Sequence, residues 1–155
     1  MTATSDVVEG SGSEMCRERI RVLILVDIPS LAGGGERLAV QTAARLNPNR
    51  FETTLCATRW DPDEEQHDIV APALAELREA GVEFLPLTRR SRADLRPWPE
   101  LIRQIRRRRI DVLHAHKFGS NVWGATVGRL GGVPVIICHE HTWSYEGKPW
   151  RAWLD

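Results

Sequence analysis

The sequence has no excess of charge of either sign. Its 21 Lys and Arg residues balance 21 Asp and Glu residues, so the formal net charge is zero. Proteins that hold nucleic acid through their overall field are strongly basic, so we expect no nucleic-acid partner. Long apolar runs are lacking as well. Residues 133–138 form one of the longest, whereas a membrane-spanning helix needs ~20 apolar residues.

Cysteine is scarce, and a secretion signal is missing. Cys16, Cys56 and Cys138 are an odd number at unrelated spacings, which argues against a disulfide framework and indicates a reducing, cytoplasmic compartment. Cys56 and Cys138 lie in apolar runs and are predicted core residues. Residues 1–19 are polar and lack the apolar segment of a signal peptide. We therefore expect a disordered tail followed by one domain over residues 20–155.

From residue 20 onward, short β-branched runs alternate with longer stretches of helical periodicity. This order predicts an α/β fold with a Rossmann-like parallel sheet and helices on both faces. Ligands of such sheets bind beyond the carboxyl ends of the strands. The predicted strands are residues 20–26, 53–57, 82–87, 110–114 and 133–138, and the predicted helices are residues 36–46, 69–80, 98–108 and 121–130.

A run of three glycines follows the first predicted strand. Gly33, Gly34 and Gly35 allow a sharp turn and a close approach of a ligand to the main chain, and Glu36 opens the next helix. The free N–H groups at that helix N-terminus favour a phosphate. Neither the G-x-G-x-x-G dinucleotide pattern nor the Gly-Lys-Ser/Thr of a P-loop is present. A tight strand-to-helix turn without a ligand is the alternative interpretation.

Two His-x-His pairs end the fourth and fifth predicted strands. Side chains at i and i+2 of a strand face the same way, so His114 and His116 are expected on one side, as are His139 and His141. If the two strands are neighbours, up to four imidazoles converge. We expect a functional role for at least one, with His116 at the ligand edge and His114 one pleat deeper. A metal site is not expected, since no Asp or Cys ligand is evident nearby.

Arginine is concentrated between Arg89 and Arg109, where nine arginines accompany only two acidic residues. Apolar residues recur at helical spacing, so the segment is amphipathic. One interpretation is a solvated helix whose apolar stripe packs on the sheet. The other is peripheral contact with an anionic membrane at its inner, cytoplasmic face. The apolar residues of the predicted stripe are Leu95, Trp98, Ile102 and Ile105.

Large aromatic residues crowd the end of the sequence. Aromatic side chains bury well and are frequent at interfaces. We therefore expect these residues to pack against polypeptide that follows this sequence. They are Trp143, Tyr145, Trp150 and Trp153.

The assembled pieces resemble glycosyltransferase family 4, whose enzymes have the GT-B fold and retain the anomeric configuration. The resemblance spans about residues 20–150 and depends on the order and spacing of the pieces together. The pieces are the Gly-Gly-Gly-Glu turn after an apolar strand, Asp111-Val-Leu-His-Ala-His116, Phe118-Gly-Ser-Asn121, and Gly132-Val-Pro-Val-Ile136 leading to Glu140-His141.

That resemblance implies two Rossmann-like domains with a cleft between them, of which this chain is the N-terminal, acceptor-side domain. The donor it implies is a nucleoside-diphosphate sugar and the acceptor a glycan or a lipid, with no cofactor. The three glycines approach the donor diphosphate, and His116 matches the histidine that contacts the donor sugar near the reaction centre. The other substrate-binding candidates are Glu36, Ser120, Asn121, Glu140 and His141.

The family's C-terminal donor domain, with its E-x7-E motif, is not in this sequence, so we expect the chain by itself to be inactive. Two alternatives stay open. One is a non-catalytic α/β module that binds a nucleotide or phosphate. The other is a hydrolase whose histidine pairs hold a metal ion.

Overall fold

Strands and helices alternate along the chain. The computed structural model describes residues 19–61, 68–89 and 94–141. In chain order the elements are β1 (Ile20–Val26), α1 (Gly34–Arg45), β2 (Phe51–Ala57), α2 (Ala71–Glu79), β3 (Glu83–Pro86), α3 (Trp98–Arg108), β4 (Val112–His116), α4 (Lys117–Gly131) and β5 (Val135–His139).

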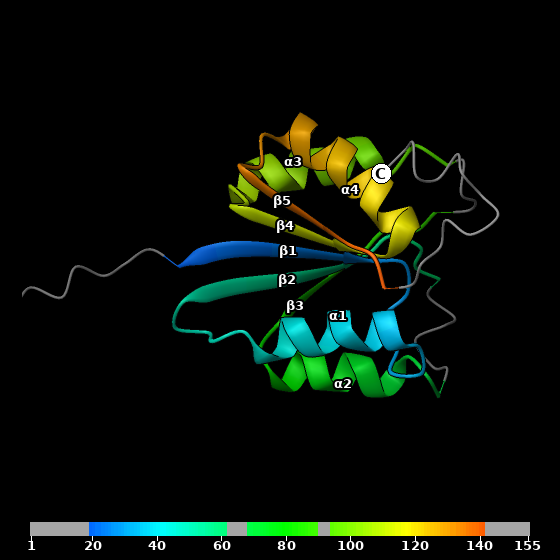
Figure 1. Ribbon diagram of the computed structural model, residues 1–155. Helices are drawn as coiled ribbons and strands as arrows, with labels where there is room; N and C mark the ends of the chain where they lie inside the picture. Colours follow the sequence, from blue (N-terminus) through cyan, green and yellow to red (C-terminus); the bar gives the residue numbers. More distant parts are fainter. Residues whose placement is uncertain (1–18, 62–67, 90–93, 142–155) are drawn as a thin grey trace, which may run out of the picture.

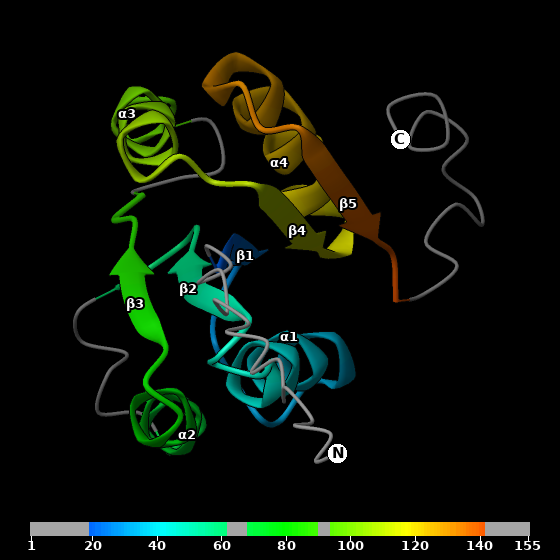
Figure 2. The same cartoon turned by 90° about the vertical axis from the view of Figure 1, so that its left-hand side faces the viewer.

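The strands form a twisted parallel sheet. Among the described residues, five strands lie in the order β3-β2-β1-β4-β5, and every neighbouring pair is parallel. α1 and α2 lie on one face of this sheet, and α3 and α4 lie on the other (Figure 1, Figure 2). Parallel neighbours need a connection that returns to the same end of the sheet, and helices supply it here. The predicted α/β, Rossmann-like fold class is confirmed.

β1 is the central strand and is buried on both faces, which explains its apolar sequence. Ile24 and Val26 pack in the cluster under α1 and α2, whereas Leu23 and Leu25 pack in the cluster under α3 and α4. Burial of one such side chain contributes about 1.5–3 kcal/mol to folding. β1 is therefore firmly held, and so is the starting point of the loop that follows its carboxyl end.

α4 lies close against β4 and β5 because two of its glycines face the sheet. A Cβ atom at Gly124 would lie 2.8 Å from Cβ of Ala115, and one at Gly128 would lie 2.8 Å from Cδ1 of Ile136. Packed carbon atoms prefer separations of about 3.5–4.0 Å, so a larger residue at either position would push the helix away from the sheet.

α3 buries an apolar stripe on the sheet, as one of the two sequence interpretations predicted. Trp98, Leu101 and Ile105 are buried. The predicted membership of the stripe was partly wrong. Leu95 is exposed because it precedes the first turn of the helix, and Ile102 is only partly buried because the helix turns Leu101 to the sheet instead.

Several arginines of α3 are engaged within the protein. Nη2 of Arg108 donates to Oε1 of Glu83 at 2.7 Å, and Nη2 of Arg106 donates to the carbonyl oxygen of Leu130 at 2.6 Å. These contacts tie α3 to β3 and to the end of α4. They leave fewer arginines for another surface, and contact with an anionic membrane stays a prediction.

The fourth strand begins and ends two residues later than the sequence predicts, and it passes directly into α4. β4 ends at His116 and α4 begins at Lys117, whereas the predicted helix begins at residue 121. The main chain turns at Lys117, which has a φ of 70°, a left-handed conformation that is uncommon for a residue with a side chain. A single left-handed residue therefore replaces the connection expected between the predicted strand and helix, residues 115–120.

β5 is an edge strand, and none of the described helices covers its α1-side face (Figure 2). Val135 and Ile137 are 48% and 42% exposed. Cys138 is also exposed, so its predicted place in the core was wrong, whereas Cys56 on β2 is buried as predicted. The sequence reasoning did not recognise that the fifth strand lies at an edge.

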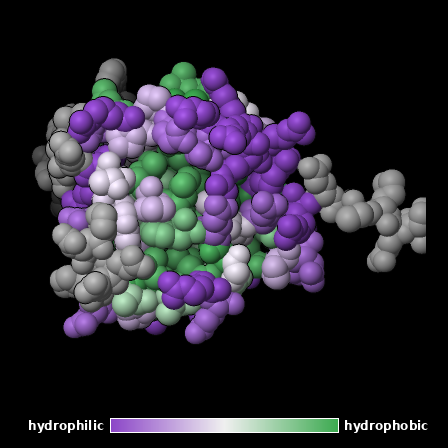
Figure 3. Space-filling view, turned by 180° about the vertical axis from the view of Figure 1, so that it is seen from behind, coloured by the Kyte–Doolittle hydropathy of each residue, from purple (hydrophilic) through white to green (hydrophobic). Residues whose placement is uncertain are grey.

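The opposite edge of the sheet carries apolar surface as well. Figure 3 views the molecule from the side of β3, where apolar surface lies between strongly polar regions. A shallow depression here is lined by Leu74, Leu77, Val82 and Phe84, among others.

Among the described residues, no helix is both long and apolar enough to cross a bilayer. Two sequence predictions fall outside the described ranges and are not addressed by the structure. They are the disorder of the N-terminal tail, of which residues 1–18 lie outside, and the packing of Trp143, Tyr145, Trp150 and Trp153.

Candidate functional site

The carboxyl ends of the strands meet the N-termini of two helices at one edge of the sheet (Figure 1). Helix N-termini present unpaired N–H groups and a partial positive charge, so this edge favours an anionic ligand. We call it the strand-end site. Its residues are Asp27, Gly33, Gly34, Gly35, Glu36, Thr58, His114, His116, Lys117, Gly119, Ser120, Asn121, His139, Glu140 and His141.

Asp27 joins three elements at the centre of this edge. Its Oδ1 accepts hydrogen bonds from Oγ1 of Thr58 at 2.9 Å and from Oγ of Ser120 at 3.2 Å. A Cβ atom at Gly119 would lie 3.4 Å from Oδ2 of Asp27, so the α4 N-terminus passes close to the carboxylate. The sequence analysis missed Asp27. The available signal was an acidic residue directly after the apolar run of residues 22–26.

Ser120 and Asn121 form part of the framework of the site. Both are buried, with exposed fractions of 0% and 1%. The side-chain amide of Asn121 faces the carbonyl oxygens of Ala115 and Lys117, with its NH2 group donating at 2.9 and 3.3 Å. Because these side chains already bond protein groups, they shape the β4–α4 junction. Their predicted contact with substrate stays a prediction.

Lys117 and Glu36 connect the N-termini of α4 and α1 through an ion pair between Nζ and Oε1. The left-handed conformation of Lys117 costs of order 1–3 kcal/mol, which the surrounding packing must offset. Such strain is frequent at functional sites, and here it places an ammonium group beside a helix N-terminus. The sequence analysis identified Glu36 as a candidate and missed its partner.

The glycine turn comes close to another part of the protein at one position. A Cβ atom at Gly35 would lie 2.9 Å from Cδ2 of His141 and 3.3 Å from Cγ of Lys117. Gly34 is exposed, and no described atom lies within 4 Å of a Cβ placed there. Gly33 is the N-cap residue of α1 and makes no side-chain cap, and a Cβ atom there would meet the carboxylate of Glu36. The turn therefore leaves the first N–H groups of α1 open beside Gly34.

Four imidazoles converge at the ends of β4 and β5, as the alternation of the two strands predicts. The ring centroids of His114 and His116 are 4.2 Å apart, those of His139 and His141 are also 4.2 Å apart, and those of His116 and His141 are 5.1 Å apart. Nδ1 of His116 and Nε2 of His141 are hydrogen-bonded at 2.9 Å. His116 and His139 occupy paired positions of neighbouring strands, which explains why the two pairs meet.

The burial of the histidines differs from the prediction. His116 is completely buried, whereas His114, expected one pleat deeper, is only partly buried. His141 packs over His116, and the two rings are hydrogen-bonded. In this conformation a substrate reaches His141 more readily than His116.

Burial and mutual repulsion lower the pKa values of His114, His116 and His141. Burial first, and then the neighbouring imidazoles, lower the pKa of His116 to about 3. Burial and His139 lower the pKa of His114, and burial is also the main cause that lowers the pKa of His141. Nε2 of His114 and Nε2 of His116 are buried without a hydrogen-bond partner among the described residues. An unpaired buried polar atom lowers the free energy of unfolding by about 1–3 kcal/mol, so the cluster destabilises the fold.

Comparison with known protein families decides the affiliation of the chain. The family model described as Glycosyltransferase Family 4 matches residues 32–155. The chain belongs to glycosyltransferase family 4. No protein in a search of curated sequences matches it.

Solved structures share the fold of this family 4 chain. HepE from Anabaena, in complex with UDP and glucose, is similar with a TM-score of 0.54 and 14% sequence identity over 77% of this chain. The complex of HepE with UDP gives a TM-score of 0.50 and 13% identity over the same share. The match covers 29% of HepE, so the aligned part of this chain spans less than a third of that protein.

A universal stress protein family protein from Arabidopsis thaliana with AMP bound is also similar. Its TM-score is 0.48 and its sequence identity is 14%, over 86% of this chain and 98% of that protein.

The remaining family 4 candidates lie at the end of β5. Oε1 of Glu140 accepts a hydrogen bond from the main-chain N–H of His141 at 3.2 Å. Oε2 of Glu140 is buried and has no partner among the residues that the structure describes. The structure thus brings Glu36, Gly35, His116 and His141 together through direct or shared contacts, whereas Gly34 stands apart at the exposed turn.

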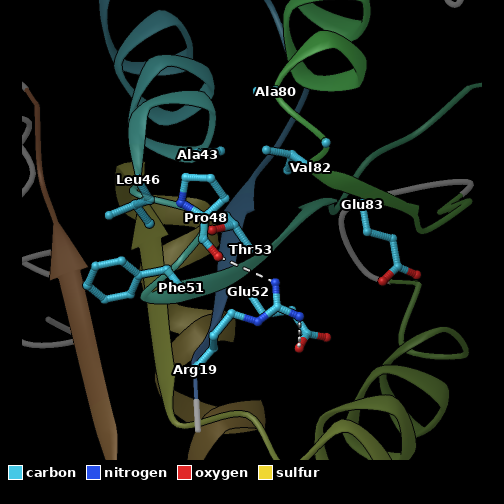
Figure 4. A pocket seen from close by; sticks show the side chains of 11 residues that line it. Arg19, Ala43, Leu46, Pro48, Phe51, Glu52, Thr53, Ala80, Val82 and Glu83 are labelled. Atoms are coloured by element: carbon cyan, nitrogen blue, oxygen red, sulfur yellow. Dashed lines mark hydrogen bonds and ion pairs between the residues drawn. The ribbon is translucent and has the colours of Figure 1, made fainter. Parts of the chain in front are cut away.

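Another hollow lies at the end of the sheet opposite the strand-end site (Figure 4). Phe51 and Glu83 begin β2 and β3, so this hollow is at the amino ends of the strands. Arg19 bonds the carbonyl oxygen of Pro48 at 3.4 Å and pairs with Glu52 at 3.5 Å across it. Parallel α/β sheets bind ligands at the carboxyl edge, so this hollow is not the candidate site of the family 4 chain.

Proposed function

We propose that this chain is the N-terminal, acceptor-side domain of a retaining glycosyltransferase. The enzyme would move a sugar from a nucleoside-diphosphate sugar to a glycan or lipid acceptor. Membership in family 4 carries the proposal. The solved structures of HepE hold UDP and glucose, which supports a nucleotide sugar as the donor. Because the match covers 29% of HepE, we propose that a C-terminal domain supplies the remaining donor contacts.

The strand-end site fits the charge that this reaction develops. Transfer breaks the bond between the anomeric carbon and a diphosphate oxygen, and negative charge grows on the leaving diphosphate. The acceptor oxygen forms the new bond to the anomeric carbon, and its proton passes to the departing diphosphate. The uncapped N-terminus of α1 and the ammonium group of Lys117 are held in position before the reaction. Preorganised N–H groups and cations stabilise such charge, so the proposal needs no cofactor for transfer.

The histidine pair His116–His141 is proposed to act on the donor sugar as a unit. His141 is partly exposed and follows the end of a strand, so its ring can meet a sugar hydroxyl. His116 is buried beneath it and bonds it at 2.9 Å, which fixes the orientation and tautomer of the outer ring. The proposal includes the sequence-based assignment of His116 to the reaction centre, with His141 as the ring that faces the substrate.

Kinetics of the full-length enzyme with His116→Ala, His141→Ala and the double variant test this proposal. Each single variant is expected to lose on the order of 10²–10³ in kcat, with a smaller change in KM. The reason is that the proposed hydrogen bond from the histidine pair to the donor sugar strengthens in the transition state. The double variant should lose about as much as either single one, since residues that act as a unit are not additive.

Cys138→Ala is the matched control, because Cys138 alternates to the opposite face of β5 and its Sγ contacts the carbonyl oxygen of Asn121. A folded His116→Ala enzyme with normal turnover would remove the pair from the reaction. The anomeric configuration of the product, read by NMR, tests retention separately. Nucleotide binding without any transfer by the full-length protein would favour a non-catalytic module instead.

A further inference from the structure

Three imidazoles on one face of β4 and β5 hold ring nitrogens close together. One ring nitrogen from each of His114, His116 and His139 lies within 4.8 Å of the other two. His116 and His139 are paired across the two strands, and His114 precedes His116 by one full pleat. We propose that these three histidines bind a divalent transition-metal ion, with Zn²⁺ as the occupant, a property beyond the proposed sugar transfer.

The unpaired nitrogens of the cluster point to a missing partner that accepts electron pairs. Nε2 of His114 and Nε2 of His116 are buried and bond no described residue. His116 is completely buried, so water does not compensate from outside. Neutral imidazole nitrogens have a lone pair to offer, and a metal ion satisfies several of them at once.

The hydrogen bond between His116 and His141 is of the kind that supports a metal-bound histidine. A metal-bound histidine usually donates its other ring N–H to a neighbouring acceptor, which fixes the tautomer of the ligand. Nδ1 of His116 lies 2.9 Å from Nε2 of His141. With Nδ1 donating to His141, Nε2 of His116 carries the lone pair for the ion.

The spacing requires a modest closure around the ion. Zn–N bonds of about 2.0–2.1 Å in tetrahedral geometry place ligand nitrogens about 3.4 Å apart. In the structure the three ring nitrogens lie within 4.8 Å of one another, so the rings must turn inward to bind the ion. His114 and His139 are both partly exposed. None of the described helices covers the α1-side face of the edge strand β5, which gives His139 room to turn and gives an ion access.

The donor set selects the class of metal. Imidazole suits Zn²⁺, Cu²⁺ and Ni²⁺, whereas Mg²⁺ and Ca²⁺ prefer oxygen ligands. The sequence analysis expected no metal because no Asp or Cys ligand was evident, but three histidines with an open fourth position suffice for Zn²⁺. Cys138 precedes His139 in the chain and therefore alternates to the opposite face of β5, where its Sγ contacts the carbonyl oxygen of Asn121.

Metal binding is measured on the 155-residue chain, purified without a polyhistidine tag and treated with EDTA. Calorimetric titration with ZnCl₂ should saturate at one ion per chain, and added CoCl₂ should give the strong visible absorption of a tetrahedral cobalt site. His114→Ala and His139→Ala should each weaken Zn²⁺ affinity by about 100-fold or more, and His141→Ala by about 10-fold, since loss of even an outer contact typically costs 10–100-fold. Cys138→Ala should bind as the parent does.

Circular dichroism of each variant shows whether it has kept its fold, and His139→Ala on the edge strand is the variant least dependent on core packing. The absence of stoichiometric Zn²⁺ binding to the parent would overturn the proposal, as would full affinity in folded His139→Ala. Because these titrations contain no nucleotide sugar, their failure leaves the transferase proposal untouched. Likewise, an inactive full-length enzyme leaves the metal site untouched.

Discussion

Gly35→Ala is expected to disturb the strand-end site, whereas Gly34→Ala is not. A Cβ atom at Gly35 would lie 2.9 Å from Cδ2 and 3.1 Å from Cγ of His141. At Gly34 the same atom would meet no described atom within 4 Å. Both residues lie in the first turn of α1, so the gain in helix propensity, up to about 1 kcal/mol, is similar for both and nearly cancels in the comparison.

The size of the difference follows from the contact between His141 and His116. Carbon atoms in contact prefer about 3.5–4.0 Å, so the imidazole of His141 must move by about 0.5–1 Å to accept the new methyl group. That movement lengthens its 2.9 Å hydrogen bond to His116 and leaves a buried ring nitrogen unpaired. An unpaired buried polar atom costs about 1–3 kcal/mol, so Gly35→Ala should be less stable than Gly34→Ala by about that amount.

Urea unfolding of the two variants, followed by circular dichroism in one buffer, measures this difference. NMR of the ¹⁵N-labelled imidazoles reports separately whether Nδ1 of His116 keeps its hydrogen bond. Equal unfolding midpoints together with unchanged His116 resonances would refute the reasoning. Equal unfolding midpoints together with a lost His116–His141 hydrogen bond would show that other contacts compensate for the lost bond, which would contradict the predicted stability difference.

Three other perturbations have defined outcomes. Gly34→Val in the full-length enzyme should raise KM for the nucleotide sugar with little change in stability, because a branched side chain would cover the open N–H groups of α1; an unchanged KM would remove Gly34 from the donor site. Arg21 bonds Asp111 through its side chain and its main-chain N–H and lowers the pKa of that carboxyl. This pair contributes about 1 kcal/mol or less to the free energy of unfolding after solvent screening. The contribution is present above the ordinary Asp pKa of about 4 and is lost as the pH falls through the lower pKa of the folded state. Asp111→Asn should therefore lose less stability than the parent between about pH 5 and pH 3, and equal losses in urea titrations would contradict the pairing. Finally, the basic segment between Arg89 and Arg109 should make the chain co-sediment with anionic vesicles at low salt and release it at high salt, since each basic residue near such a surface contributes about 1 kcal/mol; failure to sediment at low salt would exclude this contact.

Local patterns predicted the framework of the fold. The apolar run of β1 indicated a strand buried on both faces, and the alternation of strands and helices indicated a parallel sheet. The convergence of the histidines was predictable for the same reason, because i and i+2 positions on neighbouring strands share a face. These inferences need only a short window of sequence and the rule that parallel strands end at one edge.

Contacts between distant segments were not predictable in this way. Asp27 receives hydrogen bonds from residues 31 and 93 positions away in the chain, and nothing in its neighbourhood signals them. The burial of His116 depends on His141 folding back over it, and the left-handed turn at Lys117 depends on the close packing of α4. The sequence shows which residues can reach the edge, whereas tertiary packing decides which of them stays accessible.

The direct passage from β4 into α4 has a consequence for how the chain tolerates changes of length. His116 is the last residue of the strand and Lys117 is the first of the helix, so no spare residue lies between them. An inserted residue would rotate α4 by about 100° and turn Gly124 and Gly128 away from the sheet, because an α-helix advances 3.6 residues per turn. The connection of residues 27–33 between β1 and α1 has no such restriction. Homologues should therefore vary in length at that loop and keep a constant spacing across His116 and Lys117.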